Sequence, residues 1–214
     1  SAANMQVNVA GYVDTSYKGR NQSLTDLVDL IQCVITARRG NYLVFFPSYD
    51  YLRSAVQVFE NRFPQISLLV QQRKMSDEER QNFLSAFKDG GEVCGFAVMG
   101  GAFSEGVDLK GNRLIGAIVV GVGLPQIGIE RDLIRNHFPE AGFEYAYQYP
   151  GLVRVLQTAG RVIRDEEDRG IIFLVDKRYR ERRYLDLLPS EWVPRFCENT
   201  AEIAVNLESF WSRQ

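Results

Sequence analysis

Five short, continuously apolar segments, separated by helical patterns, constrain the fold of this chain more than any other feature. A continuous apolar run, in contrast to an alternating one, is typical of a strand buried on both faces, as in a parallel sheet. Strands that alternate with helices imply right-handed βαβ crossovers. The sequence therefore predicts an α/β fold, with a mostly parallel sheet covered by helices on both faces. The five segments are residues 42–46, 66–70, 93–99, 115–120 and 171–175.

Helical spacing of apolar residues fills the intervals between these strands. Ser23 and Ser48 stand where helix N-caps are expected, and Ser76 with Glu79 has the spacing of a capping box. Residues 4–22 are expected to form a mixed polar lead-in. The expected helices span residues 24–39, 49–63, 77–87, 127–137, 152–164 and 198–212.

Composition sets the limits of the fold and the partners. The chain has 214 residues, of which 45% are hydrophobic and 24% charged. A chain of this length buries about 70% of its unfolded surface, so it needs no disulfide or metal to fold. The net charge of −2 offers no overall attraction to nucleic acid or an anionic membrane, so any contact with a polyanion must be local. Basic residues do cluster at positions 177–183, where a solvated helix face is the alternative.

Cysteine and histidine patterns indicate no metal centre. Cys33, Cys94 and Cys197 are far apart, no CxxC occurs, and the single histidine is His137. These spacings predict no zinc site, no iron–sulfur cluster and no disulfide framework in this chain. We expect a cytoplasmic protein without a membrane partner, since there is no secretory signal and no apolar run of about 18 residues.

One polar stretch combines a glutamine with two arginines at helical spacing. Gln157, Arg161 and Arg164 fall within about 60° of one another on a helix of 3.6 residues per turn. Gly160 flanks that face and leaves room for a ligand or another backbone. Two guanidiniums aimed at one place suit a phosphate chain. The alternative is a solvated helix face or a cluster of ion pairs.

Ligands of parallel sheets bind outside the carboxyl ends of the strands, so the segments after the strands carry the candidate sites. Three stretches stand out, at residues 45–49, 101–109 and 157–164. Their order resembles motifs IV, V and VI of superfamily 2 helicases. The chain is most similar to the second, RecA-like motor domain of the XPD/DinG-like branch, whose patterns read like GxxxEGxDL, QxxGRxIR and DxG before a strand ending in Asp. The resemblance covers roughly residues 12–195.

The resemblance implies roles for the residues of motif VI and part of motif V. Arg164 matches an arginine finger that reaches the γ-phosphate of ATP. Arg161 and Gln157 match residues that contact the same triphosphate or hold the finger. Asp108 matches a carboxylate that reads the nucleotide or couples it to the strand, with a plain turn residue as the alternative. Gly106 and Gly160 complete the implied nucleotide-binding set.

The resemblance also implies a surface for single-stranded DNA. Ser48 and Tyr49 match the strand-facing loop of motif IV, although Ser48 also fits a helix N-cap. Arg80 falls where related helicases place a phosphate-contacting arginine, and a helix-surface charge is its alternative. For Glu105, the alternative to a strand contact is an ion pair with a nearby arginine. The part of motif V along the nucleic-acid backbone comprises Gly100, Gly101, Ser104 and Glu105.

Residues 121–150 are the least regular part, and their role stays open, a lid against the first motor domain being one reading. Tyr145, Tyr147 and Tyr149 alternate there and offer rings for base stacking, with core or interface packing as the alternative.

Other expected motor elements are absent from the sequence. There is no GxxxxGK[ST] phosphate loop, and no acidic pair follows an apolar strand. The resemblance therefore implies the C-terminal motor domain of a longer ATP-dependent DNA helicase that serves DNA repair. ATP and Mg²⁺ would be held mainly by the N-terminal motor domain of the same protein, which is also where an iron–sulfur cluster would lie.

We expect the isolated chain not to hydrolyse ATP. The expected organisation is a lead-in or expression remnant at 1–22, a motor domain at 23–197 and a C-terminal helix at 198–214. The rival readings are a non-catalytic RecA-like module that binds nucleic acid or protein, and a different α/β enzyme such as a nucleotide-dependent transferase.

Overall fold

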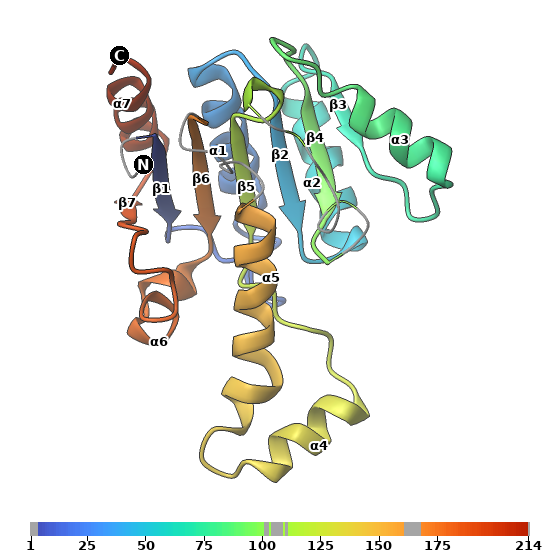
Figure 1. Cartoon of the computed structure of the whole chain (residues 1–214), viewed down its shortest axis with the longest axis vertical. Helices are drawn as coiled ribbons and strands as arrows, with labels where there is room; N and C mark the ends of the chain where they lie inside the picture. Colours follow the sequence, from blue (N-terminus) through green and yellow to red (C-terminus); the bar gives the residue numbers. More distant parts are fainter. Residues whose placement is uncertain (1–3, 101–102, 104–108, 110, 161–167, 214) are drawn as a thin grey trace.

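A seven-stranded parallel sheet organises the chain (Figure 1). The computed structural model describes residues 4–100, 103, 109, 111–160 and 168–213. The order across the sheet is β3-β4-β2-β5-β6-β1-β7, and the register places Tyr42 opposite both Cys94 and Gly116. The strands are β1 Met5–Ala10, β2 Tyr42–Phe46, β3 Leu68–Val70, β4 Cys94–Val98, β5 Gly116–Val120, β6 Gly170–Val175 and β7 Arg195–Cys197.

Helices cover both faces of this sheet and divide the core in two. One apolar cluster joins the sheet to α1, α2 and α7, and the other joins it to α3, α5 and the segment that includes α6. Strands β2, β5 and β6 are buried at every position, as a sheet covered on both sides requires. The helices are α1 Leu24–Ala37, α2 Tyr49–Arg62, α3 Asp77–Ser85, α4 Ile129–His137, α5 Tyr149–Ala159, α6 Arg182–Leu185 and α7 Thr200–Trp211. The shorter turns are η1 Gly111–Arg113, the π-helical η2 Glu144–Gln148 and η3 Lys177–Arg180.

The predicted α/β class, the five strands and the long helices are confirmed, but two strands were missed. The expected polar lead-in is wrong for residues 5–10, which form β1 between β6 and β7. Met5–Ala10 contains buried Gln6 and Asn8, whose amides hydrogen-bond each other at 2.9 Å. Because those amides interrupt the apolar pattern, a continuous-run criterion overlooks a strand that is nevertheless buried.

The three predicted cap residues are the N-caps of α1, α2 and α3, and two of them cap with their side chains. Ser48 accepts a hydrogen bond from the Tyr51 N–H at 3.3 Å, and Ser76 forms the full capping box with Glu79. Ser23 is not a side-chain cap, because its hydroxyl donates to the Asp14 carbonyl oxygen at 2.6 Å. That contact ties the segment after β1 to the start of α1.

An arm, defined as residues 124–153, projects from the sheet. It contains α4, η2 and the first turn of α5, and Figure 1 shows it extending from the side toward which the strand arrows point. The chain enters and leaves the arm where Gly123 meets Gly151: a Cβ on Gly123 would lie 2.4 Å from the Gly151 carbonyl oxygen. The small residues therefore let the two backbones cross in contact.

Candidate functional site

The carboxyl ends of the strands gather three of the six predicted site residues that the structure describes. All paired strands are parallel, so the segments after β2, β3, β4 and β6 meet at one edge of the sheet. Ser48 and Tyr49 follow β2, and Gly100 follows β4. α5, which carries Gln157, packs against β5 on one face of the sheet.

Gln71 links the loop after β2 to the end of β4. Its side-chain amide donates to the Tyr49 hydroxyl at 2.8 Å and accepts from the Val98 N–H at 2.8 Å. Gln71 is only 6% exposed, so both bonds are sheltered from water. The position of the Tyr49 ring is therefore coupled to the strand that leads into Gly100.

A pocket with a mixed polar and apolar lining opens beside this link. The Arg73 guanidinium lies 5.4 Å from the centroid of the partly buried Tyr49 ring, within cation–π range. The pocket has a volume of about 530 Å³ between α2 and β3. An aromatic ring, a guanidinium and amides at one mouth suit a nucleobase or a phosphate. The lining residues are Tyr49, Leu52, Arg53, Val56, Gln57, Glu60, Val70, Gln71, Gln72 and Arg73.

The turn after β4 lies against the helix of predicted motif VI. Gly100 has φ +73°, and a Cβ there would lie 3.6 Å from Nε of Arg154. Arg154 precedes Gln157 by three residues, about one helical turn. The structure therefore brings the start of predicted motif V next to a guanidinium on the motif VI helix.

Two predicted residues of motif VI are described. Gln157 is exposed on α5, and Gly160 is the C-cap of that helix, with its N–H bonded to the Leu156 carbonyl oxygen at 2.9 Å. The shared face of Gln157, Arg161 and Arg164 stays a prediction. The predicted residues outside the described part of the chain are Gly101, Ser104, Glu105, Gly106, Asp108, Arg161 and Arg164.

Arg80 lies on α3 and not on a strand end. Its guanidinium pairs with Asp77 on the same helix at 3.0 Å. The geometry agrees with the alternative of a helix-surface charge, and a strand-contacting role for Arg80 stays a prediction.

A buried carboxylate at the end of β6 anchors the segment after β1. Asp176 is fully buried and accepts hydrogen bonds from the Thr15 hydroxyl and from the Arg178 guanidinium, the latter at 2.7 and 2.8 Å. Lys177 pairs with Asp14 at 2.6 Å. Burial opposes ionisation of Asp14, but hydrogen bonds and charge from Lys177 and Ser16 outweigh it and lower its pKa to about 2.

The predicted basic cluster at 177–183 is largely neutralised by nearby carboxylates. Lys177 and Arg178 pair as described above, Arg180 pairs with Glu198, and Arg183 pairs with Glu181 at 2.6 Å. These partners reduce the charge available to a polyanion. The segment therefore serves mainly to hold the end of β6 to neighbouring loops.

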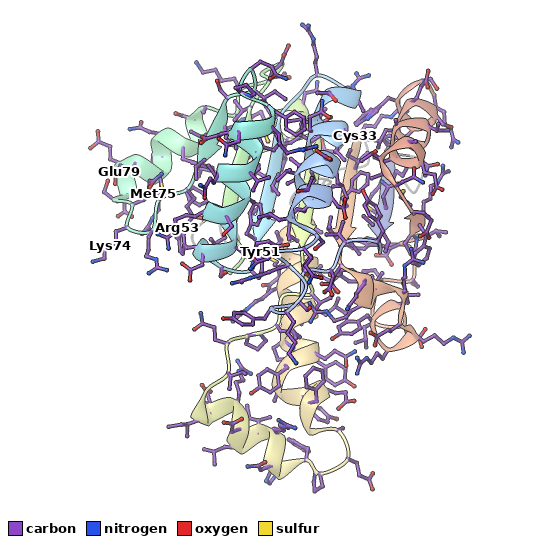
Figure 2. All side chains as sticks on the ribbon, turned by 180° about the vertical axis from the view of Figure 1, so that it is seen from behind. Cys33, Tyr51, Arg53, Lys74, Met75 and Glu79 are labelled. Atoms are coloured by element: carbon purple, nitrogen blue, oxygen red, sulfur yellow. The ribbon has the colours of Figure 1, made fainter. Side chains whose placement is uncertain are left out.

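An aromatic and basic group that sequence reasoning missed lies at the same edge. Figure 2 shows Tyr51 near the start of α2, on the side of the sheet from which the arm extends. The Arg20 guanidinium lies 4.8 Å from the Tyr17 ring centroid and 5.4 Å from that of Tyr51. The Tyr51 hydroxyl is buried without a hydrogen-bond partner among the described residues. Burial, helped by the charge of Asp176, raises the Tyr51 pKa, so the hydroxyl stays protonated.

Gln71, Arg154 and Arg20 are the main site residues that the sequence did not reveal. Each belongs to the site because it contacts another segment of the chain, and no local sequence motif identifies it. Asp176 could be found, because it ends an apolar strand and belongs to the family-like pattern. The three alternating tyrosines differ in burial. Tyr147 is 6% exposed and packs against Phe143, whereas Tyr145 and Tyr149 are 48% and 38% exposed.

A larger hollow lies away from this edge. A hollow of about 840 Å³ between α1, α2 and α7 contains none of the predicted site residues. Within the described ranges, no group of three or more His, Cys, Asp and Glu side chains is arranged to hold a metal ion. None of the helices described is long and apolar enough to span a bilayer.

The fold, a parallel α/β domain with these loops at the carboxyl ends of its strands, gives the class of protein. Sequence comparison then gives the family. The family described as helicase C-terminal domain matches residues 31–195. This chain belongs to that family.

Named relatives agree with this assignment. The chain is 25% identical over 215 residues to a probable ATP-dependent helicase of Methanocaldococcus jannaschii, covering 92% of this chain and 30% of that protein. It is 26% identical over 191 residues to the general transcription and DNA repair factor IIH helicase subunit XPD of Dictyostelium discoideum, covering 80% and 24%. The chain thus spans about a quarter to a third of the curated relatives it matches.

Solved structures support the fold. An XPD helicase superposes with a TM-score of 0.68 at 22% identity, covering 90% of this chain and 35% of that one. The second domain of the DEAD-box helicase Mss116p gives 0.52 at 14% identity, covering 98% and 70%. The RecA-like fold is therefore confirmed.

Proposed function

We propose that this chain is the second motor domain of a longer ATP-dependent DNA helicase or translocase of the XPD type. The observation that carries the proposal is the juxtaposition, in a member of the helicase C-terminal family, of the Gly100 turn with the helix that bears Arg154 and Gln157. Motor domains of this kind work by placing such groups at an interface with a partner domain. Activity, DNA as substrate and a role in repair are part of this proposal.

The proposed chemistry is ATP hydrolysis at the boundary between two motor domains. Arg164 would stabilise charge on the γ-phosphate, with Arg161 and Gln157 holding the phosphates or the finger. Mg²⁺ would be held mainly by the N-terminal motor domain of the same polypeptide. Gly106, Asp108 and Gly160 would complete the nucleotide side of the interface.

The proposed strand contacts come from loops at the same edge. Ser48, Tyr49 and the segment from Gly100 to Glu105 would contact single-stranded DNA mainly through its backbone, which requires no base readout. The Gln71 link supports this idea, because it couples the Tyr49 ring to the strand that precedes Gly100. Nucleotide-dependent movement of one loop would thereby reach the other.

The test is ATP turnover by the full-length polypeptide, with and without single-stranded DNA, for wild type and Arg164→Ala. Loss of an arginine finger lowers turnover by about 10³-fold to 10⁵-fold, and ATP binding should persist. Arg39→Ala is the control, because Arg39 is a highly exposed surface arginine away from the proposed site. Unchanged turnover in Arg164→Ala would reject the finger and favour the non-catalytic binding module.

A further inference from the structure

Exposed apolar side chains concentrate on the arm. Seven of the eleven large hydrophobic residues that are exposed in the described part of the chain fall between positions 127 and 153. Exposed apolar surface gathered in one place marks an interaction site more often than scattered residues do. The seven are Ile127, Ile129, Leu133, Phe138, Tyr145, Tyr149 and Val153, with exposed fractions from 38% to 85%.

Three of these residues form an apolar stripe, defined as Tyr145, Tyr149 and Val153. They are spaced four residues apart, which places them along one side of a helix. The Tyr145 and Tyr149 ring centroids lie 5.4 Å apart, and Phe138 extends the ring contacts at 4.6 Å from Tyr145. The next position at the same spacing is Gln157, also exposed. The stripe therefore runs along α5 toward the predicted nucleotide site.

Packing inside the arm shows that the stripe is presented by an ordered element. Arg131 donates to the Ala146 carbonyl oxygen at 3.3 Å, and the buried Tyr147 donates to Asp132 at 3.5 Å. The amide of Gln148 also donates to the Arg183 carbonyl oxygen, which ties the arm to α6. Tyr147 and Gln148 face inward, while their neighbours Tyr145 and Tyr149 remain exposed.

The charge of the arm selects a protein partner over a nucleic acid. Its carboxylates are Glu130, Asp132, Glu140 and Glu144, and its guanidiniums are Arg131 and Arg135. Carboxylates outnumber guanidiniums by two to one, and Arg131 is already used inside the arm. Phosphate backbones bind where cations neutralise them. Aromatic and aliphatic side chains with an acidic surround instead suit an apolar protein surface flanked by basic groups.

We propose that the apolar stripe docks on the first motor domain of the same polypeptide. This inference rests on the proposed function, which places that domain against Gln157 on α5. From Tyr145 to Gln157 is twelve residues, or about 18 Å at 1.5 Å per residue. A domain that contacts Gln157 is therefore large enough to contact the apolar stripe as well. The relatives, which are three to four times longer than the matched segment, have ample chain to supply such a body.

Site-specific photocrosslinking in the full-length polypeptide tests the proposal. Benzoylphenylalanine would replace Tyr149, or in a second variant Val153, and crosslinked peptides would be identified by mass spectrometry. Val205 on α7 is the matched control, because it is 66% exposed and lies on a helix that covers the other face of the sheet. We expect crosslinks from Tyr149 and Val153 to residues preceding this chain, at a yield several-fold above that from Val205.

Each other outcome would overturn the docking proposal. Crosslinks between two copies would assign the stripe to self-association, crosslinks to added single-stranded DNA would assign it to the strand, and a yield equal to that of Val205 would leave it solvent-facing. The readout does not depend on ATP turnover. If the expected crosslinks form but Arg164→Ala leaves ATP turnover unchanged, only the proposed arginine finger is rejected. If the crosslinks to the first motor domain are absent but Arg164→Ala abolishes ATP turnover, only the docking proposal is rejected.

Discussion

Gly100 turns the chain out of β4 with φ +73°, in the left-handed region where a Cβ is strained. We predict that Gly100→Ala lowers the free energy of unfolding by about 1–2 kcal/mol. The cost would be backbone strain and not a clash, because the new Cβ would sit 3.6 Å from Arg154, an ordinary contact. Urea unfolding of the variant and of wild type measures this change in the free energy of unfolding.

The control for that substitution is Gly128→Ala. Gly128 has an extended backbone and open space around the position of a Cβ. Gly128 is also the N-cap of α4, so Ala there should cost only the lost cap preference, without the strain of a positive φ. Equal stability of the Gly100 variant and wild type would show that the turn tolerates a side chain.

Asp14 gives the site a pH-dependent contribution to stability. Its pKa is about 2 in the folded chain, below the ordinary value of 3.8, so its stabilisation is fully present above about pH 4 and disappears as pH falls toward 2. Lys177 is half exposed, so solvent screening keeps the effect of Asp14→Asn below about 1 kcal/mol. Urea titrations from pH 7 to pH 3 should show the difference between wild type and variant shrinking below pH 4.

Asp89→Asn is the reference for the pH series, since Asp89 is exposed on the loop after α3. A stability difference between wild type and Asp14→Asn that grows at low pH would contradict the assigned direction of the Asp14 pKa.

Among the elements, the side chain of Gln71 joins the start of α2 and the end of β4 to the residue after β3. We predict that Gln71→Ala costs about 1–2 kcal/mol, because it leaves the partly buried Val98 N–H without its side-chain acceptor. The same change removes the bond that Gln71 donates to the Tyr49 hydroxyl, leaving the longer one, at 3.5 Å, from that hydroxyl to the Gln72 carbonyl oxygen. The looser Tyr49 ring should weaken single-stranded DNA binding by the full-length protein. Urea unfolding and fluorescence anisotropy measure the two effects.

Gln72→Ala separates this link from a general loss of loop polarity. Gln72 is exposed, and its amide donates only to the carbonyl of Val70 at 3.3 Å among the described contacts. It should leave stability and strand affinity near wild type. Matching losses in both variants would argue against a specific role for Gln71.

At the scale of the whole molecule, this domain supplies one side of the proposed ATP site. We predict that the purified 214-residue chain shows no ATP turnover above background and binds single-stranded DNA only weakly and with strong salt sensitivity. The reason is the absence of a phosphate loop and the net charge of −2. A coupled ATPase assay with full-length protein as positive control is the measurement. Steady turnover by the pure chain would sink the two-domain mechanism.

Local signals determined the class of fold and the expected motor assignment. Continuous apolar runs predicted the buried strands, helical spacing predicted the long helices, and Ser76 with Glu79 predicted its capping box correctly. These signals act over a few residues, so a single sequence contains them fully. The family assignment likewise depended on short motifs in the right order.

Tertiary structure alone decided the order of the strands and the surroundings of the site. Residues 5–10 became a strand because β6 and β7 pair with them, more than 150 residues away in the chain. Gln71 became a link because β4 lies beside β3, and the basic cluster near Lys177 lost its free charge to distant carboxylates such as Asp14 and Glu198. Tyr147 was buried while Tyr145 and Tyr149 were exposed, since packing within the arm selects one side of the helix. Such partners are chosen by the free energy of the packed chain as a whole, and no periodicity in the sequence encodes them.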